Sequence, residues 1–413
     1  MSRKELTILM PCLNESLTLE TCIRRARKLL VDHGIRGEIL VSDNGSTDGS
    51  RQIAEKAGAR VINCPVRGYG AALQFGIEHA GGEFTLMGDS DDSYHFDEAF
   101  PMIEKLREGF DVCMGTRLKG KIMPGAMSPL NRYLGNPVLT TIGQRFFRIP
   151  TSDFHCGMRA FRTDCIRGIN LVTTGMEWAS EMVIKSKLQG LRMTEVPITL
   201  YRDGRDRLPH LRRWRDGWRH LRFMLMHSPH WLFIFPGMLL AASGMLGEMK
   251  LMNGIIQIGS AMLDVQTMIV LSFMLISGVQ MLFTGLMADI YSHTSGVFPY
   301  TGKYLKSIKG LTLEKLLLLA ILVGGVGGAG FGGVLWEWYK TGFGALDFEM
   351  TMRQLIPSMA LITISGQCIF NGFMLSVLLM PTKSSFNLYG STAIEHHPLS
   401  HAAPAADCSG GLK

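Results

Sequence analysis

Four long apolar segments in the second half of the chain constrain its fold more than any other feature. They run from Pro229 to Leu246, Thr267 to Met287, Leu316 to Leu335 and Leu355 to Met380. Each is long enough, or nearly so, to cross a hydrocarbon core of about 30 Å as a helix. Pro236 interrupts the first of them. We therefore expect an all-α transmembrane domain of about four helices over residues 227–381.

The first half of the chain reads as a water-exposed domain over residues 1–207. Here short apolar runs alternate with charged, periodic segments. Strands are expected at Leu6–Met10, Glu38–Asp43, Val61–Asn63, Phe84–Met87 and Asp111–Thr116, with helical patterns between them. Strands and helices alternating at this spacing predict an α/β fold, with a parallel sheet covered by helices on both faces.

Arginines are concentrated where the two halves meet. The formal charge of the chain is +7, which fits nucleic acid, anionic lipid or a phosphorylated substrate. From about Leu208, arginines alternate with Trp214, Trp218 and other apolar residues at helical spacing. An apolar segment follows directly, so we expect an amphipathic helix at the membrane interface over residues 208–226 and no nucleic-acid partner.

Charge also predicts the orientation in the membrane. The connection after the second apolar segment carries four lysines, whereas the one after the third is acidic on balance. Positive-inside reasoning places the lysines, the first domain and both termini in the cytoplasm. The start of the chain lacks a signal-peptide pattern, the eight scattered cysteines indicate reduced thiols, and residues 382–413 are expected to be a disordered tail.

Asp89, Ser90 and Asp91 directly follow the run Phe84–Met87. They would lie at the carboxyl end of a strand, where open α/β sheets place their ligands. Two carboxylates there can hold Mg²⁺ or Mn²⁺ and leave coordination positions for a substrate phosphate. Taken alone, an Asp-x-Asp triplet is more often a solvated loop.

Two earlier loops carry polar residues that would reach the same edge. Glu15 and Asp43 could accept hydrogen bonds from a nucleobase or ribose, and Arg67 with Gly68 could contact a base or phosphate. Their alternatives are a helix-start acid, a turn former and a surface charge. No P-loop or G-x-G-x-x-G motif is present, which disfavours an ATPase or a dehydrogenase.

Four motifs in register resemble the family 2 inverting glycosyltransferases with the GT-A fold. They are Pro11-Cys12-Leu13-Asn14-Glu15, Ser42-Asp43-Asn44-Gly45-Ser46-Thr47-Asp48-Gly49, Arg67-Gly68-Tyr69-Gly70 and Gly88-Asp89-Ser90-Asp91. The chain is most similar to the polyprenyl-phosphate sugar synthases, which include dolichyl-phosphate mannose synthase and undecaprenyl-phosphate glucosyltransferases. The resemblance covers roughly the first half of the chain.

The resemblance implies a donor site. Asp89 and Asp91 would hold Mg²⁺ or Mn²⁺ against the diphosphate. Ser93 stands where mannose synthases have a glutamine, and Asp92 precedes it, so the third protein contact to the metal stays open. The nucleotide-sugar site would also include Pro11, Leu13, Glu15, Ser42, Asp43, Arg67, Gly68, Ser90, Ser93, Arg202 and Arg207.

The resemblance also implies an acceptor site. Arg117 and Arg132 match arginines that bind the lipid phosphate, and Asp153 would either orient them or form a structural ion pair. His155 and Cys156 follow Asp153. We interpret them as a packed, hydrogen-bonded histidine and a buried cysteine instead of a nucleophile or metal ligand.

The implied reaction is inverting transfer of a hexose from UDP-glucose, GDP-mannose or a similar donor to a dolichyl or undecaprenyl phosphate. A homo-oligomer is compatible with the sequence. One rival is a processive polysaccharide synthase, because His210-Leu211-Arg212-Arg213-Trp214 resembles its Q-x-x-R-W motif except at the first position. The other is a non-catalytic membrane scaffold with a vestigial nucleotide fold.

Overall fold

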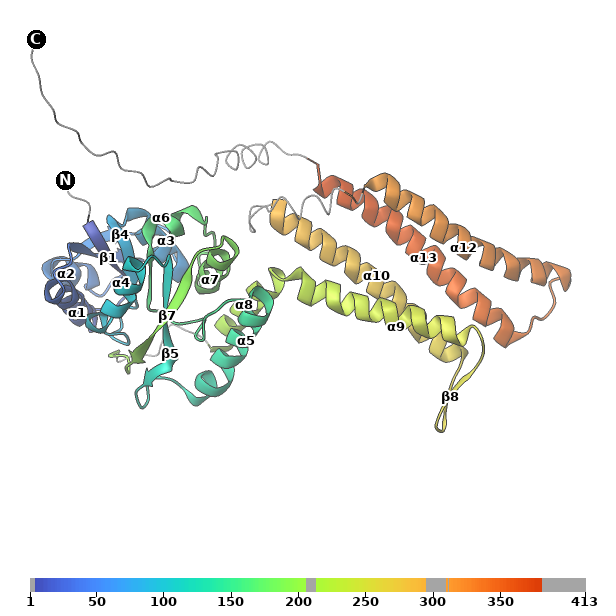
Figure 1. The fold of residues 1–413 in the computed structure, drawn as a ribbon, viewed down its shortest axis with the longest axis horizontal. Helices are drawn as coiled ribbons and strands as arrows, with labels where there is room; N and C mark the ends of the chain where they lie inside the picture. Colours follow the sequence, from blue (N-terminus) through green and yellow to red (C-terminus); the bar gives the residue numbers. More distant parts are fainter. Residues whose placement is uncertain (1–3, 206–212, 295–309, 311, 381–413) are drawn as a thin grey trace, which may run out of the picture.

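The computed structural model describes residues 4–205, 213–294, 310 and 312–380. It has an α/β domain followed by long helices that extend away from it (Figure 1). Arg207, three of the four lysines after the second apolar segment and the tail predicted for residues 382–413 lie outside the described residues.

A seven-stranded sheet forms the centre of the first domain, in the order β3-β2-β1-β4-β6-β5-β7. β1 pairs in parallel with β2 and β4, and β5 pairs in parallel with β7. The strands are β1 (Lys4–Cys12), β2 (Gly37–Asp43), β3 (Arg60–Asn63), β4 (Gly82–Met87), β5 (Val112–Ile122), β6 (Arg159–Arg162) and β7 (Met193–Leu200).

The predicted parallel sheet is wrong at β6, which runs antiparallel to both of its neighbours, β4 and β5. The alternation of apolar runs specifies strands but not their direction, and this four-residue strand is too short to give a pattern of its own. Its register sets Arg159 beside Met87. The start of β6, and the residues just before it, therefore lie at the carboxyl end of β4.

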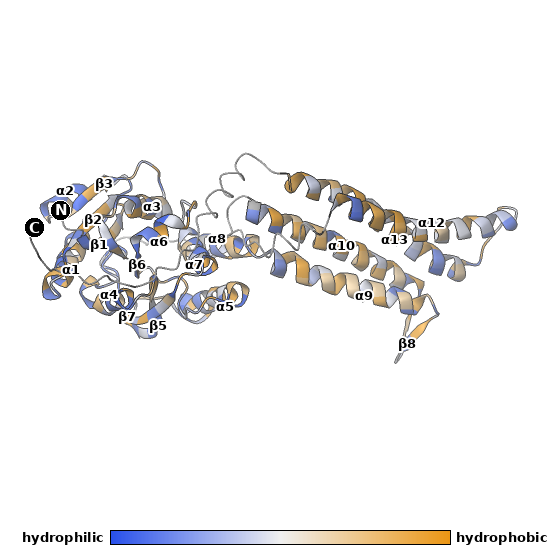
Figure 2. Ribbon diagram, turned by 45° about the horizontal axis from the view of Figure 1, so that its top comes forward, coloured by the Kyte–Doolittle hydropathy of each residue, from blue (hydrophilic) through white to orange (hydrophobic). Residues whose placement is uncertain are grey.

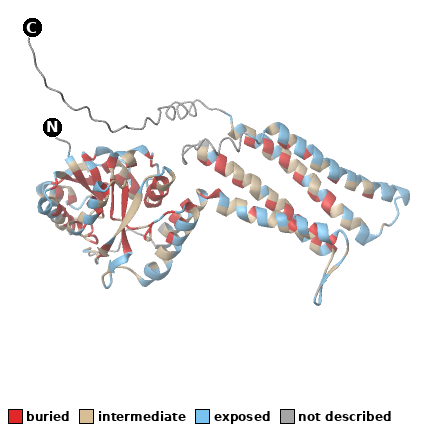
Figure 3. Cartoon of the chain, viewed as in Figure 1, coloured by how far each residue is buried: buried red, intermediate tan, exposed pale blue. Residues whose placement is uncertain are grey.

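Helices cover both faces of the sheet, and a separate apolar core lies on each side. On one face α1 (Leu19–Asp32) buries five residues at spacings of three and four, which is the stripe expected of a helix packed on a sheet. On the other face α3 (Tyr69–His79) and α7 (Trp178–Leu188) bury Leu73, Ile77 and Trp178. Figure 3 shows this buried interior around the strands. The remaining helical elements of this domain are α2 (Ser50–Lys56), η1 (Phe96–Glu98), α4 (Phe100–Arg107), η2 (Asn131–Gly135), α5 (Asn136–Phe147) and α6 (Thr163–Gly168).

Four helices in the described part of the second half are long and apolar enough to cross a membrane. They are η3–α9 (His230–Leu251), α10 (Val265–Thr294), α12 (Leu313–Lys340) and α13 (Phe348–Leu378). α9 packs on α10, α10 on α13, and α13 on α12. Hydrophobic colouring predominates along these helices (Figure 2), and many of their large apolar side chains are exposed. A short hairpin of β8 (Ile256–Ile258) and β9 (Ala261–Leu263) joins α9 to α10 at the end far from the sheet (Figure 1).

Pro236 does not break the first membrane helix. It lies at the start of α9, directly after the π-helical turn η3 (His230–Ile234), and local π-helical adjustments of this kind let a membrane helix tolerate a residue without a backbone N–H. α10 and α12 extend beyond their predicted bounds at both ends, and α13 begins seven residues before its predicted start and ends two before its predicted end. Charged and aromatic residues continue these helices outside the apolar segments.

Helix α8 (Arg213–Met226) joins the two parts. Trp214 and Trp218 are 81% and 57% exposed, whereas Phe223 and Met224 are buried in the core beside α7. Across this junction the rings of Phe146 and Trp231 stack with centroids 5.2 Å apart. The α/β domain is therefore attached to the start of the first membrane helix by side-chain packing as well as by the chain.

The glycines of α12 that face α13 are spaced three residues apart. A Cβ at Gly324, Gly327 or Gly330 would lie within 2.8 Å of an atom of α13, whereas one at Gly325 or Gly328 would meet nothing within 4 Å. The glycine-rich stretch predicted to allow close packing therefore does so on one face only.

Gly327→Val should lower the thermal unfolding midpoint of the purified protein in detergent by about 3–8 °C, because its side chain would push α12 away from α13. Gly328→Val is the matched control, since it adds the same atoms at the next position but on the open face. Equal midpoints for the two variants would contradict this packing.

Candidate active site

Asp89 follows the carboxyl end of β4 and lies in a closely packed environment. The hydroxyl of Tyr69 donates to its Oδ1 at 3.0 Å, and Gly157 packs so closely that a Cβ there would lie 2.6 Å from Oδ2. Burial, together with the negative charge of Asp91, raises the pKa of Asp89 to about 6. A cation beside this carboxylate would stabilise its ionised form and so oppose this rise in pKa.

Asp91 is fixed by two neighbours on opposite oxygens. The backbone N–H and hydroxyl of Ser93 donate to Oδ1 at 3.0 and 2.5 Å. On the other side, Nη2 of Arg205 donates to Oδ2 at 2.6 Å. Ser93 therefore orients the carboxylate of Asp91, and one of its oxygens is left to a cation.

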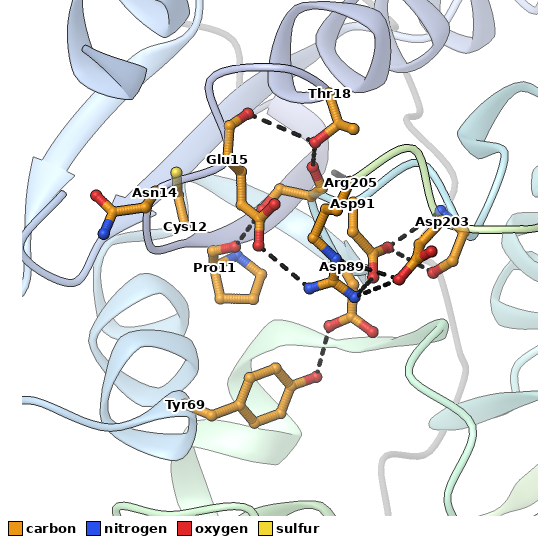
Figure 4. A network of polar contacts seen from close by, with 12 residues as sticks. Pro11, Cys12, Asn14, Glu15, Thr18, Tyr69, Asp89, Asp91, Asp203 and Arg205 are labelled. Atoms are coloured by element: carbon orange, nitrogen blue, oxygen red, sulfur yellow. Dashed lines mark hydrogen bonds and ion pairs between the residues drawn. The ribbon is translucent and has the colours of Figure 1, made fainter. Parts of the chain in front are cut away.

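Arg205 joins three acidic residues that lie far apart in the sequence. Besides Asp91, its guanidinium contacts Oε1 of Glu15 at 3.3 Å and Oδ2 of Asp203 at 3.1 Å. Figure 4 shows these carboxylates gathered around the one guanidinium, with Asp89 beside it. The side chain of Arg205 is only 14% exposed, so these charges interact with little screening by water.

Hydrogen bonds join the end of β1 and the loop after it to the acidic loop. The hydroxyl of Ser90 donates to the carbonyl of Pro11 at 2.7 Å. The hydroxyl of Thr18 donates to the carbonyl of Ser90, also at 2.7 Å (Figure 4). These bonds hold the loop of Glu15 at a fixed distance from the loop of Asp91, so that a ligand could contact both loops.

Asp92 points away from this cluster. Its backbone has a φ of +59°, and its Oδ1 accepts from Nε of Arg25 at 2.9 Å. Neither Asp92 nor Ser93 is therefore arranged as a third metal ligand beside Asp89 and Asp91.

The predicted nucleotide-pocket residues at the end of β2 have two different environments. Ser42 is fully buried beside Pro11, and its hydroxyl oxygen has no hydrogen-bond partner in the described part of the chain. Asp43 instead accepts from Arg51 Nε at 2.6 Å and from the backbone of Gly45 and Ser46. Burial raises the pKa of Asp43, but these bonds outweigh it and lower the pKa overall.

Gly68 has a structural requirement of its own. Its φ of +145° is in the region that favours glycine, and a Cβ there would lie 2.1 Å from the carbonyl oxygen of Thr174. Its N–H donates to Oδ1 of Asn44 at 2.8 Å. The neighbouring Arg67 is exposed, and Leu13 is half-buried after β1.

Arg117 and Asp153 form a buried bidentate ion pair. Nε and Nη2 of Arg117 donate to the two carboxylate oxygens at 2.6 and 2.7 Å. Asp153 is fully buried and Arg117 is 9% exposed. The antiparallel direction of β6 makes this pair, because it brings the residues before Arg159 to β5. Of the two roles considered for Asp153, orienting an arginine and forming a structural pair, the geometry combines both at Arg117.

The other predicted arginines are separate from the acidic cluster. Arg132 is exposed on η2 and contacts the ring of Tyr133, with 5.5 Å between the guanidinium carbon and the ring centroid. Arg202 is also exposed. No contact among the described residues links either of them to Asp89 or Asp91.

As predicted, His155 is packed and hydrogen-bonded and Cys156 is buried. His155 packs edge-on against His220, and Ser180 lies within hydrogen-bonding distance of both rings. Burial lowers the pKa of His155 well below its usual value and raises the pKa of Cys156 to about 12. All seven cysteines in the described ranges are free thiols.

The acidic pair fits a divalent cation that keeps open positions. No group of three or more His, Cys, Asp or Glu side chains converges on one point within the residues described. Two carboxylates with a substrate diphosphate are the ligand set that Mg²⁺ commonly uses. Asp89 and Asp91 meet that requirement, and Arg205 shows that a positive charge is held there.

The sequence reasoning missed two residues of the site. Tyr69 belongs to the Arg67–Gly70 motif, which places it near the site, but the motif does not indicate that its hydroxyl contacts Asp89. Arg205 was overlooked because it is one of eight arginines between Arg202 and Arg222, and no local pattern distinguishes it.

Comparison with known proteins identifies relatives of both parts of the chain. Residues 7–169 match the family described as glycosyl transferase family 2, and residues 286–379 match the glycosyltransferase family 2 C-terminal transmembrane region. The low-salt glycan biosynthesis hexosyltransferase Agl6 of Haloferax volcanii is 34% identical over 90% of this chain and 89% of its own length.

Further similarities cover the first domain. The dolichyl-phosphate hexose transferase of Haloferax volcanii is 31% identical over 40% of this chain and 69% of its own. Glucosyl-3-phosphoglycerate synthase of Mycobacterium tuberculosis, solved with Mn²⁺, UDP and glucosyl-3-phosphoglycerate, covers 55% of this chain and 80% of its own, with 21% identity and a TM-score of 0.45.

Asp153→Ala should destabilise the α/β domain by about 3–5 kcal/mol, because it leaves the guanidinium of Arg117 buried without its counter-ion. Chemical denaturation followed by tryptophan fluorescence measures this loss. Lys119→Gln is the control, since it breaks the exposed ion pair of Lys119 with Glu195, which should cost about 0–1 kcal/mol. A small effect of Asp153→Ala would contradict the importance of the buried pair.

Proposed function

The chain belongs to glycosyl transferase family 2, and from that premise we propose that it transfers a hexose from a nucleotide diphosphate sugar to the phosphate of a polyprenyl phosphate. The observation that carries the proposal is an acidic site at the carboxyl end of β4, in a domain joined by packing to four membrane helices. A hexose donor and a lipid phosphate acceptor are also in keeping with the names of its relatives Agl6 and the dolichyl-phosphate hexose transferase.

The donor would bind across the ends of β1, β2 and β4. Ser42 offers a buried hydroxyl for the base or ribose, and Glu15 offers a carboxylate on the opposite loop. Asp43 supports the pocket by holding the turn after β2. The diphosphate would then lie between Asp91 and the arginines of the segment after β7.

A divalent cation held by Asp89 and Asp91 would stabilise the negative charge of the departing nucleoside diphosphate. Ser93 orients Asp91 for this role, and Tyr69 orients Asp89. The chain itself contributes the position of both carboxylates.

The acceptor would approach from the membrane side of the domain. Arg132 lies among the exposed apolar residues Leu130, Tyr133 and Leu134. η2 leads into α5, whose Phe146 stacks on Trp231 at the start of the first membrane helix. An arginine in an apolar surface near the membrane suits a phosphate carried on a lipid chain. Arg117, held by Asp153, would add a fixed positive charge behind it.

The acceptor phosphate needs no strong general base, because a phosphate monoester is already anionic at neutral pH, with a second pKa of about 6. Positioning of two anionic substrates and stabilisation of the leaving group would supply most of the rate. Direct displacement by the phosphate oxygen predicts inversion at the anomeric carbon.

The membrane topology follows from the same arrangement. Four helices between α8 and the end of α13 are long and apolar enough to cross a membrane, and four crossings would return the chain to the side on which it started. The α/β domain and the connection between α10 and α12 would therefore face the cytoplasm, where nucleotide sugars are available.

The function is tested by incubating the purified protein with polyprenyl phosphate and a panel of UDP- and GDP-hexoses, then measuring the extracted lipids by mass spectrometry. We expect one hexose added per polyprenyl phosphate with at least one donor. Products of many sugar units would favour the polysaccharide synthase, and no product with any donor would contradict transfer to the lipid.

Asp91→Asn should reduce turnover by at least about 100-fold, because the amide is a poor ligand for the cation that stabilises the leaving group. Asp92→Asn removes the same charge from the next residue, which pairs with Arg25 instead, and should retain turnover within a few-fold. Equal activities of the two variants would remove the proposed metal site.

Arg132→Gln should raise the KM for polyprenyl phosphate by about 10-fold and leave the KM for the nucleotide sugar unchanged, because it removes a charge-assisted phosphate contact. Initial rates at varied acceptor and donor concentrations separate the two. A rise in the KM for the nucleotide sugar alone would contradict the proposed role of Arg132 in binding the acceptor phosphate.

A further inference from the structure

We propose that Arg205 is a built-in competitor of the divalent cation, which it replaces on Asp91 until metal and nucleotide arrive together. The inference rests on the metal site of the proposed function and adds a control on its use. In the free enzyme, the guanidinium of Arg205 neutralises the acidic cluster. In the donor complex, the metal ion takes its place on Asp91.

The geometry places the guanidinium on the oxygen that a metal would use. Oδ1 of Asp91 is engaged by Ser93, so Oδ2 is the oxygen that faces a ligand, and Nη2 of Arg205 contacts it at 2.6 Å. A guanidinium and a metal ion cannot both occupy that position. Metal binding at Asp91 therefore requires Arg205 to move.

The charge balance explains why Arg205 rests there in the free enzyme. Asp91 and Glu15 are both buried, and Asp203 completes the set around Arg205. Carboxylates brought this close repel one another unless a cation lies between them. Removing Arg205 without a replacement would leave buried negative charges uncompensated, so exchange with another cation is favoured over simple departure.

The backbone just before Arg205 is held by hydrogen bonds, so a side-chain rotation is sufficient for the exchange. The N–H of Gly204 donates to the carbonyl of Asp91 at 3.0 Å, and the N–H of Tyr201 donates to the carbonyl of Ser93 at 3.0 Å. The segment before Arg205 thus pairs with the acidic loop at Asp91 and at Ser93. The long arginine side chain can leave Asp91 while its Cα stays beside the site.

The diphosphate gives the displaced guanidinium a new partner. Arginine matches phosphate oxygens with two parallel hydrogen bonds, and a diphosphate bound to the metal would lie within reach of a side chain anchored at Gly204. Metal alone would therefore bind weakly, because it must displace Arg205 into water. Metal with nucleotide would bind much more tightly, because the displaced arginine is paired again.

The test measures the affinity of the full-length protein for Mn²⁺ from the electron paramagnetic resonance signal of free Mn²⁺, with and without UDP or GDP. Arg205→Gln should bind Mn²⁺ alone roughly five- to tenfold more tightly than the wild type, because the competitor is gone. In the wild type, the nucleotide should tighten Mn²⁺ binding by a factor within the range of about 5–150-fold that is usual for coupled sites. In Arg205→Gln this factor should be correspondingly smaller.

Arg25→Gln is the matched control for the loss of charge. It removes one positive charge beside the same acidic loop, but Arg25 pairs with Asp92 at 2.9 Å and not with Asp91. Its Mn²⁺ affinity should stay within about twofold of the wild type, since a charge outside the site acts only through a screened field. Arg205→Lys keeps the competing charge and should retain most of the coupling between Mn²⁺ and the nucleotide. This variant provides a second test if Arg205→Gln folds poorly.

The outcomes separate this inference from the function on which it rests. Unchanged or weaker Mn²⁺ binding by Arg205→Gln, with coupling intact, would overturn the competition. Asp91→Asn should abolish the Mn²⁺ site in either background. If Asp91→Asn binds Mn²⁺ like the wild type, the proposed metal site itself is wrong, whatever Arg205 does.

Discussion

The pairing of clustered carboxylates with a cation at the carboxyl end of β4 is the interaction on which the site depends. Glu15, Asp91 and Asp203 come from three separate loops, and each would repel the others without a positive charge between them. Arg205 supplies that charge in the structure. In the proposed function, the same requirement would favour binding of a divalent cation together with the phosphates of the donor.

The direction of one short strand organises the other half of the site. β6 runs antiparallel between β4 and β5, so the residues before it return to the edge where Asp89 lies. Asp153 can then hold Arg117, and Gly157 can pack against Asp89. The stacking of Phe146 on Trp231 connects the α/β domain to the first membrane helix. Under the proposed function, one domain would then meet both a soluble donor and a lipid-borne acceptor.

Much of the fold could be predicted from the sequence because its signals are local. Four apolar segments predicted four long helices, and an apolar run ending in Asp89 and Asp91 predicted a strand with its site at the end. The direction of β6 could not be predicted, because four residues carry no directional pattern. The partner of Asp91 was equally inaccessible, since Arg205 is 114 residues away and resembles its neighbouring arginines.

The most direct measurement of the central claim is a structure of the protein with Mn²⁺ and a nucleoside diphosphate, with the ion located by its anomalous scattering. We predict that the ion lies within coordination distance of Asp89 and Asp91, with the guanidinium of Arg205 moved from Asp91 to the diphosphate. An ion bound elsewhere, with Arg205 still on Asp91, would contradict the account.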